Sequence, residues 1–498
     1  MAVVLKRLIS LYRLKTAEAA QNNAISHPVT PVCIDGLSAE DWQSRGNDHV
    51  DQGEIAEAER CYRKAIAANP SYARAHNNLG LALKEQGRIG MAREHLLRAA
   101  AIDPTLYQAQ LNLGEIAREQ GEFQIAAGYF ERCLIIDPDS EDALLSLVYV
   151  LFRQNQSGKA RLLLEQALVK QPDSLSLHFY LGNLSKEASE LDRARLEYER
   201  CCELDPNFWP AIFNLGLVHQ QRQDWTAAKT RLRQAVEMPG QGGGQLALGE
   251  LLLLLGELPE GFSLLEQRFE SDKPEYSYLA GMLSRFGGVP RWQGEPLAGK
   301  RLLVWAEQGL GDTLMMARYL PQLKALGVAS LVVYCQSHLV RVFQGMADVD
   351  MVESQTGKSI SSAFDVHCSM MSLPHLLHST LDTLPSQAPY LSVPDERKTA
   401  WAARLSPLSG LKVGLVWAGN PMLAKDALRS IPLRDWAPIL AVQGVSFVSL
   451  QKSEASAQLA GTSFPITDWM SQSTDLLDTA ALVGKRPAKS SSQSLVIP

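Results

Sequence analysis

The sequence predicts two architectures in one chain, an all-helical repeat array followed by two α/β domains built on parallel sheets. Two observations lead to this prediction. In the first half of the chain, prolines recur at a constant interval. In the second half, short apolar stretches alternate with helix-like segments, which is the pattern of a parallel sheet covered by helices.

The overall composition is that of a globular protein with 498 residues, 46% hydrophobic residues and a net charge of −6. This balance gives no electrostatic reason to expect nucleic acid or an anionic membrane as a partner. No apolar run reaches the roughly 18 residues of a membrane span. Basic residues interrupt the apolar stretch 2–15 too early for a signal peptide, so we expect a short amphipathic helix within an N-terminal extension, 1–36.

The cysteine pattern favours a reduced compartment. The chain has seven cysteines and no C-x-x-C pair, and four of the seven lie within the repeats, where small apolar residues pack. We therefore expect the protein in the cytoplasm.

The repeat period is 34 residues, read from the prolines Pro70, Pro104, Pro138, Pro172 and Pro206. It defines the repeats 39–72, 73–106, 107–140, 141–174, 175–208 and 209–242. Leu-Gly recurs as the seventh and eighth residues of most repeats. The twentieth residue is always Ala, and the twenty-fourth is aromatic or Leu. This pattern resembles the tetratricopeptide repeat (TPR), which implies a right-handed superhelix over 37–270, comprising six repeats and a degenerate seventh.

The sixth residue of three repeats is asparagine: Asn78, Asn112 and Asn214. The array resembles the superhelix of O-GlcNAc transferase, in which a ladder of asparagines holds an extended polypeptide by its backbone amides. An amide side chain suits this role because it donates and accepts hydrogen bonds at once. The resemblance implies a protein or peptide partner bound by these residues. The alternative is that they are solvated helix residues of an ordinary array.

The second half contains two α/β segments. Strands are expected at 301–305, 330–334 and 364–368, which define a first domain over 271–400. A second domain over 411–498 begins with a strand at 411 and continues through a helix at 435–442 into a strand at 446–451. The proline-containing stretch 381–398 connects the two.

A sharp turn follows the first expected strand and contains Gln308, Gly309 and Gly311 before Asp312 opens a helix. A dinucleotide fingerprint would need a third glycine at Leu314, and the phosphate-loop Gly-Lys-Ser/Thr does not occur there. From spacing alone, Asp312 is either the N-cap of this helix or a catalytic carboxylate.

Several motifs in this half extend the comparison: Arg291-Trp292-Gln293-Gly294, Glu307-Gln308-Gly309-Leu310-Gly311-Asp312, Ala317-Arg318-Tyr319, Val416-Trp417-Ala418-Gly419-Asn420, Lys425-Asp426 with Arg429-Ser430, and Ser449-Leu450-Gln451-Lys452. Together they resemble the glycosyltransferase module that follows TPR arrays in bacterial proteins. That module is similar to glycosyltransferase family 9, the heptosyltransferases, which have a GT-B fold of two facing Rossmann-like domains.

The resemblance implies an inverting transfer in which the first domain holds the acceptor and the second holds a nucleotide-sugar. Asp312 matches the general base, and Gln308, Gly309, Gly311 and Asn420 match binding positions. Lys425 and Arg429 would balance the donor diphosphate without a metal; their alternative is a solvated loop. We expect no metal and no cofactor besides the nucleotide-sugar substrate. His375 and His378 have no evident third ligand and are expected to be loop residues.

The sequence departs from the family at 484–498, a polar stretch with proline and serine that we expect not to supply a buried central strand. At about 30 residues per βαβ unit, the second domain is then expected to have about three strands and to be incomplete. Weak nucleotide-sugar binding without turnover is the corresponding expectation. The alternative function is a TPR scaffold with an inert transferase-like domain.

Overall fold

A computed structural model of the chain describes residues 33–238, 243–271, 276–357, 360–387, 389–421, 426, 429–452, 454–484 and 494–497. The chain divides into two compact units, 1–241 and 242–498. The helix predicted at 2–15 and the predicted site residue Lys425 lie outside the described residues.

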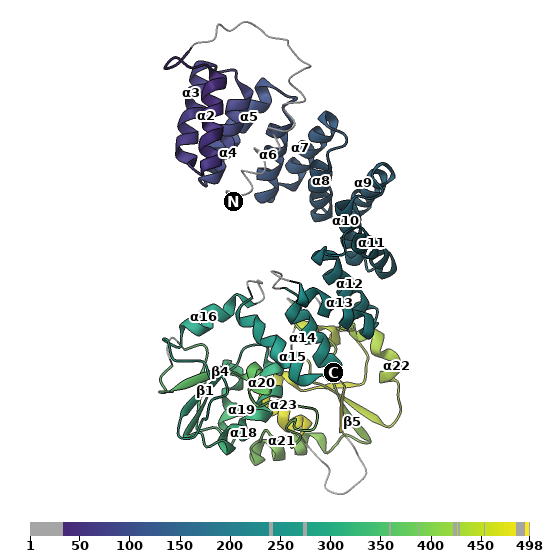
Figure 1. Cartoon of the computed structure of the whole chain (residues 1–498). Coiled ribbons are helices and arrows are strands. Elements are labelled where there is room, and N and C mark those ends of the chain that lie inside the picture. The colour runs from purple at the N-terminus through teal and green to yellow at the C-terminus, as the bar shows by residue number, and fades with distance from the viewer. Residues whose placement is uncertain are drawn as a thin grey trace. The chain divides into compact units, whose positions relative to one another are not determined.

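The first unit consists of helix pairs, one pair for each predicted repeat (Figure 1). The first helices of the pairs are α2 (Ala39–Gln52), α4 (Ala73–Glu85), α6 (Tyr107–Glu119), α8 (Glu141–Arg153), α10 (Leu175–Glu187) and α12 (Trp209–Gln221). The second helices are α3 (Ile55–Ala68), α5 (Ile89–Ile102), α7 (Phe123–Ile136), α9 (Ser157–Lys170), α11 (Leu191–Leu204) and α13 (Trp225–Glu237). The predicted helical repeats are confirmed, and α3, α5, α7, α9 and α11 each end two residues before a ladder proline, because proline cannot continue a helix.

Small residues let the two helices of each repeat approach closely. The alanine at the twentieth position is fully buried in all six repeats. The glycine at the eighth position lies directly against the residue at the twenty-fourth: a Cβ atom on Gly182 would come within 2.7 Å of the Tyr198 ring, and one on Gly114 within 2.6 Å of Phe130. The Gly and the aromatic or Leu residue therefore form one interlocking contact in five of the six repeats, the exception being the fourth, where the eighth residue is Val148.

The second unit begins with α14 (Gly244–Leu254) and α15 (Leu258–Leu265), followed by the 3-10 turn η1 (Glu266–Phe269) and α16 (Tyr278–Ser284). The sequence places the end of the array at 270, whereas the compact division places α14 and α15 with the α/β part. Arg268 of η1 connects this helix pair to the first sheet through hydrogen bonds to Glu307 and Ser372.

The first sheet contains β1 (Arg301–Trp305), β2 (Ser330–Cys335), β3 (Met351–Ser354) and β4 (Val366–Ser369), all parallel, in the order β3-β2-β1-β4. It is accompanied by α17 (Leu310–Met316), α18 (Leu320–Ala325), α19 (Val340–Gln344) and α20 (Leu373–Leu376). Leu302 and Val304 pack into one core, while Leu303 and Trp305 pack into a second core that includes Leu279 of α16. Both faces of the sheet are thus covered, as parallel sheets require.

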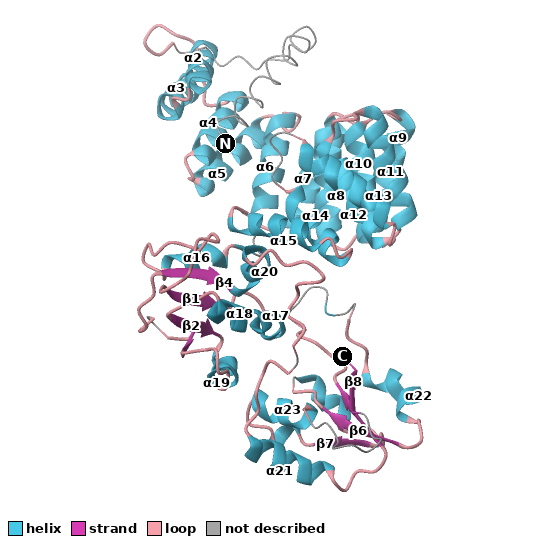
Figure 2. Cartoon of the chain, turned by 60° about the horizontal axis from the view of Figure 1, so that its bottom comes forward, coloured by secondary structure: helices cyan, strands magenta, loops and turns pink. Residues whose placement is uncertain are grey.

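The second sheet contains β5 (Leu411–Leu415), β6 (Val445–Ser449), β7 (Ile466–Asp468) and β8 (Ser494–Ile497), again parallel, in the order β7-β6-β5-β8. Strands β6, β7 and β8 are labelled in Figure 2. Its helices are α21 (Asp395–Leu405), α22 (Ala437–Leu440) and α23 (Leu476–Val483). The expected count of about three strands is wrong by one. The polar tail ends in the run Leu495-Val496-Ile497, whose composition suits a strand, and β8 pairs with β5 at the edge of the sheet.

The two sheets therefore share one strand order, in which the third, second, first and fourth strands lie side by side. In open parallel sheets of this kind, ligands bind beyond the carboxyl ends of the strands, where the strand order reverses. That place lies between β1 and β4 in the first sheet and between β5 and β8 in the second. The loops after β1 and β5 carry the predicted site residues.

Candidate functional site

Asn78 and Asn112, two of the predicted peptide-binding residues, belong to a chain of side-chain amides that crosses the first helices of three repeats. Asn78 Nδ2 donates to Asn47 Oδ1 (3.1 Å), and Asn77 Nδ2 donates to Asn78 Oδ1 (3.1 Å). Asn112 Nδ2 donates to Asn77 Oδ1 (3.0 Å). The exposed fractions of Asn78 and Asn112 are 9% and 6%, so these amides connect neighbouring repeats.

Asn214, the third predicted residue, lies half-buried in a different set of contacts. Its Nδ2 donates to Asn183 Oδ1 (3.3 Å), and its Oδ1 accepts from Lys186 Nζ (2.8 Å). Tyr198 Oη donates to the same Asn183 oxygen (2.7 Å). We call Asn183, Lys186, Tyr198 and Asn214 the Lys186 cluster. Burial lowers the pKa of Lys186, and the adjacent Glu187 offsets part of that shift.

The sequence prediction missed Asn183 and Lys186. A signal for Asn183 was present, because asparagine as the ninth residue with tyrosine as the twenty-fourth occurs in the first repeat (Asn47, Tyr62) and again in the fifth (Asn183, Tyr198). In the first repeat, Tyr62 Oη likewise donates to Asn47 Oδ1 (2.8 Å).

The turn after β1 holds Asp312 in a local contact. Gly309 is the N-cap of α17, and Asp312, its third residue, accepts from the Gly309 N–H through Oδ2 (3.1 Å). Asp312 is therefore not the N-cap itself. Gln308, Gly309 and Gly311 are exposed, and the Gln336 side chain donates to the Gln308 carbonyl (2.6 Å), which fixes the turn against the end of β2.

Arg268 of η1 lies beside this turn and is 3% exposed. Its Nε and Nη2 donate to the two carboxylate oxygens of Glu307 (2.6 and 2.9 Å). Its Nη1 donates to the Leu265 carbonyl (2.9 Å) and to Glu266 (2.7 Å), and Nη2 also donates to Ser372 (2.9 Å). All five N–H groups of the guanidinium are thereby used.

The same network joins both sides of the switch point of the first sheet. Glu307 follows β1, and Ser369 at the end of β4 donates to it. Because Arg268 reaches Glu307 and Ser372 together, a side chain from the helical segment occupies the place between the β1 and β4 loops. No periodic pattern or motif in the sequence indicates this role of Arg268.

The loop after β5 is held by Gln451, which follows β6. Its Oε1 accepts from the Trp417 and Ala418 N–H groups (both 3.0 Å). Beyond this point, Gly419 N–H donates to Ser430 Oγ (3.0 Å), and Ser430 Oγ donates to Asp426 (2.8 Å). Each sheet thus uses a glutamine after its second strand to fix the loop after its first.

Arg429 lies at the outer side of this loop with 58% of its side chain exposed, and its Nε donates to Asp426 Oδ1 (3.2 Å). A Cβ atom on Gly419 would clash with Asp426 and come within 2.6 Å of Arg429, so only glycine permits this approach. Asn420 is exposed. The structure therefore brings Arg429 and Gly419 together next to Asn420.

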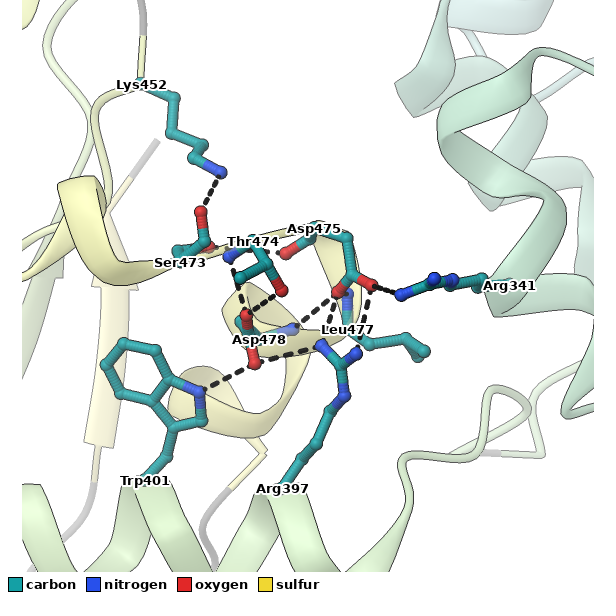
Figure 3. Close-up of polar contacts among 9 residues, drawn as sticks. All are labelled: Arg341, Arg397, Trp401, Lys452, Ser473, Thr474, Asp475, Leu477 and Asp478. Carbon is teal, nitrogen blue, oxygen red and sulfur yellow. Dashed lines mark hydrogen bonds and ion pairs between the residues drawn. The ribbon is translucent and has the colours of Figure 1, made fainter.

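A polar network surrounds the start of α23 (Figure 3). Asp475 is the N-cap and accepts from the Leu477 and Asp478 N–H groups. Arg397 of α21 donates to both Asp475 oxygens (2.6 and 3.1 Å), and Arg341 of α19 pairs with the same carboxylate (3.3 Å). These contacts connect the helices of the two sheets.

Asp478 lies in the same network. Burial alone would raise the pKa of Asp478, but hydrogen bonds from Trp401 and Thr474 and the charge of Arg397 outweigh it and hold that pKa well below its ordinary value.

Within the described ranges, no group of three or more His, Cys, Asp or Glu side chains is arranged to hold a metal ion. His375 lies in α20, and His378 lies just after it with φ of 50°. In the same part of the chain, none of the helices has the length and apolarity needed to cross a membrane.

The comparisons with known proteins bear on the helical half. Residues 44–106 and 117–181 match two family models, each described as tetratricopeptide repeat. The first unit is built of tetratricopeptide repeats. Such repeats are protein-interaction modules, so they imply a protein or peptide partner.

Three similar proteins illustrate the likeness. Protein FlbA of Caulobacter vibrioides is 32% identical over 235 residues, which cover 43% of this chain and 38% of that protein; the match thus spans less than two fifths of the relative's length. Pseudomonas aeruginosa pilF (19% identity, TM-score 0.37) matches 43% of this chain and 97% of its own. A tetratricopeptide repeat protein of Parabacteroides merdae (17% identity, TM-score 0.42) matches 49% and 96%.

Proposed function

We propose that the chain holds a partner polypeptide on its repeats and carries a glycosyltransferase-like module of the GT-B type. The module would transfer a sugar from a nucleotide-sugar to a hydroxyl group. The single observation that supports this most is the pair of parallel sheets with the same strand order, each with motif residues in the loop after its first strand. Loops at this place are where parallel sheets bind their ligands.

The proposed chemistry uses one carboxylate and one or two cations. Asp312 accepts the proton of the acceptor hydroxyl while that oxygen forms a bond to the anomeric carbon of the sugar. The bond from that carbon to the nucleoside diphosphate breaks, and the diphosphate leaves with the bonding electrons. Arg429, together with Lys425, balances the charge of the leaving diphosphate. Gln308, Gly309, Gly311 and Asn420 line the two loops.

Arg429 has the exposure that its role requires. Its guanidinium keeps donors beyond the single described bond to Asp426, and a planar guanidinium suits two-point contact with phosphate oxygens. The absence of a side chain at Gly419 lets Asp426 and Arg429 lie directly against the backbone of this loop.

A second candidate function is that of a scaffold with an inert module, and two observations favour it. Asp312 already accepts a hydrogen bond from the Gly309 N–H, as a helix-capping carboxylate does. Arg268 also fills the switch point of the first sheet from within the chain. In this case the repeats alone would carry the function.

One experiment separates the two candidates. The full chain is incubated with a panel of UDP-, GDP- and ADP-sugars, and release of nucleoside diphosphate is measured for wild type, Asp312→Asn and Arg429→Ala. Asp382→Asn serves as control because Asp382 is an exposed carboxylate that belongs to neither loop. Transfer predicts release that falls about 10²-fold or more in Asp312→Asn and is unchanged in the control. If no nucleoside diphosphate is released, or if Asp312→Asn and wild type release it equally, sugar transfer by this site is contradicted. The scaffold function is then the one supported.

The interaction function is tested separately. The double variant Asn78→Ala, Asn112→Ala should weaken capture of partner proteins by the full chain, because it removes hydrogen-bonding groups of the first helices and the bonds that connect neighbouring repeats. Equal capture by variant and wild type would show that partners bind elsewhere.

A further inference from the structure

Glu307 is the last buried residue before the exposed turn that leads to Asp312. The side chain of Glu307 is 0% exposed, whereas Gln308 and Gly309 are exposed. Its carboxylate accepts four hydrogen bonds, two from Arg268, one from Ser369 and one from Tyr278. A carboxylate offers about four lone-pair positions, so these four bonds fix the place of the group.

The four bonds come from three separate elements of the second unit. Arg268 belongs to η1, Tyr278 to α16, and Ser369 to the end of β4. Arg268 also donates to Ser372, which follows β4 and itself donates to Glu266 (3.0 Å). The helical segment therefore holds the loops after β1 and β4 together, with Arg268 in contact with both.

Arg268 does not compete for the exposed groups of the turn. It is 3% exposed, and the hydrogen bonds that it makes within the described residues use its five N–H groups without reaching the backbone of 308–312. The arginine thus supports the turn from the buried side and leaves the side that faces a ligand open.

The turn itself has two anchors. Gln336, which follows β2, donates to the Gln308 carbonyl (2.6 Å), and the bonds to Glu307 hold the other side. Only four residues separate Glu307 from Asp312, so a displacement of Glu307 is passed on to Asp312. In a catalytic site, a misplacement of about 1 Å can lower the rate about 10²-fold.

We propose that Arg268 is a positioning residue for the transfer reaction: by holding Glu307, it sets where Asp312 meets the acceptor hydroxyl. The inference rests on the proposed transfer function, and it adds a residue outside both loops to that site. A buried ion pair gives little net stability, because the loss of hydration offsets the attraction between the charges. What the two-point contact of Arg268 adds is a defined geometry.

The first test is hydrogen–deuterium exchange of the full chain, followed by mass spectrometry, in wild type and Arg268→Met. The peptide 306–316 contains hydrogen-bonded N–H groups of Ala306, Gly309 and Thr313. We expect this peptide to exchange at least about tenfold faster in the variant, because the turn opens more often when Glu307 is not held. The peptide 330–335, which is β2, should change less than about twofold. Exchange of 306–316 at the wild-type rate would overturn the proposal.

A double variant, Arg268→Met with Glu307→Gln, separates positioning from stability. Arg268→Met alone leaves a buried carboxylate without its cation and should lower the melting temperature. In the double variant no charge is left unpaired at Glu307, so the melting temperature should return close to that of wild type. The turn should still exchange at least about tenfold faster, since Met and Gln do not reproduce the two-point contact. If both quantities return to wild type, the pair is merely structural and the proposal is wrong.

Arg301→Met is the matched control. Arg301 is the first residue of β1 and pairs with Asp365, which directly precedes β4 (2.6 Å). This pair joins the same two strands at their other ends, away from the turn. Its loss should change exchange of 306–316 less than about twofold. Equal acceleration by Arg301→Met and Arg268→Met would show that any break between the two strands loosens the turn, contrary to a specific role of Arg268.

Kinetics then connect the turn to the reaction. Where wild type releases diphosphate, Arg268→Met should lower kcat about tenfold or more. Its KM for the nucleotide-sugar should stay within about twofold, because the proposed donor residues lie after β5. A raised KM with unchanged kcat would contradict positioning of Asp312. If wild type releases no diphosphate, the transfer function is contradicted, whereas the exchange comparison still decides whether Arg268 holds the turn.

Discussion

The contacts between the first and second repeats and those between the fifth and sixth repeats use the same residue types at the same positions. In both, a tyrosine hydroxyl and the next repeat's asparagine donate to one asparagine oxygen: Tyr62 and Asn78 to Asn47, and Tyr198 and Asn214 to Asn183. The difference is the twelfth residue, which is Val50 in the first repeat and Lys186 in the fifth. One cation fixes the direction of every bond in its cluster, whereas the neutral cluster is completed by another amide, Asn77.

A second pair of equivalent contacts differs in the same way. The fourth residue of each of two repeats is a histidine whose Nε2 contacts the carbonyl of the preceding ladder proline, His76 with Pro70 (3.1 Å) and His178 with Pro172 (2.9 Å). The Nδ1 of His76 faces His95 (3.1 Å), whereas that of His178 faces Glu197 (2.7 Å). The same repeat geometry thus places a second histidine beside His76 and a carboxylate beside His178.

The largest expected effect concerns the glycine that lies against each tyrosine. A Cβ atom on Gly46 would clash with the Tyr62 ring, and one on Gly182 would come within 2.7 Å of Tyr198. Gly46→Ala and Gly182→Ala should each lower the free energy of unfolding by about 1–3 kcal/mol, measured by urea denaturation.

Gly128→Ala is the control for these two variants. Gly128 lies within α7 with no atom near an added Cβ, so alanine there should raise the free energy of unfolding by about 0.5–1 kcal/mol. If Gly182→Ala is as stable as wild type, the close packing of Tyr198 against the first helix is wrong.

The next effect is acid sensitivity of the histidine pair. Burial lowers the pKa of His76 and of His95, and the neighbouring Arg98 adds to the shift of His76. A histidine whose pKa is lowered by folding binds protons more readily in the unfolded state, so stability is lost as pH falls through its ordinary value of 6.5. Denaturation midpoints at about pH 7.5 and 5.5 measure this loss.

Exchanging the residues that face the two histidines tests this comparison in both directions. His95→Glu gives the second repeat the arrangement of the fifth and should remove the acid loss at this site. Glu197→His gives the fifth repeat the arrangement of the second and should add an acid loss. An identical pH response of both variants would show that the two histidines do not control it.

The smallest effect is expected at alkaline pH. Because burial lowers the pKa of Lys186 below its ordinary value of 10.5, the unfolded state holds this proton to higher pH. Stability therefore rises as pH increases from the lowered pKa towards 10.5. Lys186→Met should lack this rise and Lys84→Met should keep it, when unfolding is followed by urea titration across that range.

The helical half of the fold was predictable because each repeat contains the residues that determine its own helix boundaries and packing. The proline ladder set the period, and the alanine and glycine positions set the packing, so local sequence and final contacts agree. Strands β1, β2 and β5 were found for a related reason, since each is a short apolar run. The strands β3, β7 and β8 were missed; β3 and β7 are only four and three residues long, too short to show a pattern.

The site was less predictable because its decisive contacts join segments far apart in sequence. Arg268 and Glu307 are 39 residues apart and form their ion pair only when η1 packs on the sheet. Lys186 and Asn214 are 28 residues apart and meet only because α12 packs beside α10. Asn78, Asn112 and Asn214 share one position in their repeats, but their hydrogen-bond partners depend on the neighbouring repeat.

The most direct test of the comparison between the two clusters is the pKa of Lys186 itself, measured by NMR in the full chain labelled with [ε-13C]lysine. The Lys186 signal is identified by its absence in Lys186→Arg. This pKa should lie below its ordinary value of 10.5, because burial beside the neutral Asn214 amide disfavours the charged ammonium. A Lys186 pKa at or above 10.5 would contradict the account.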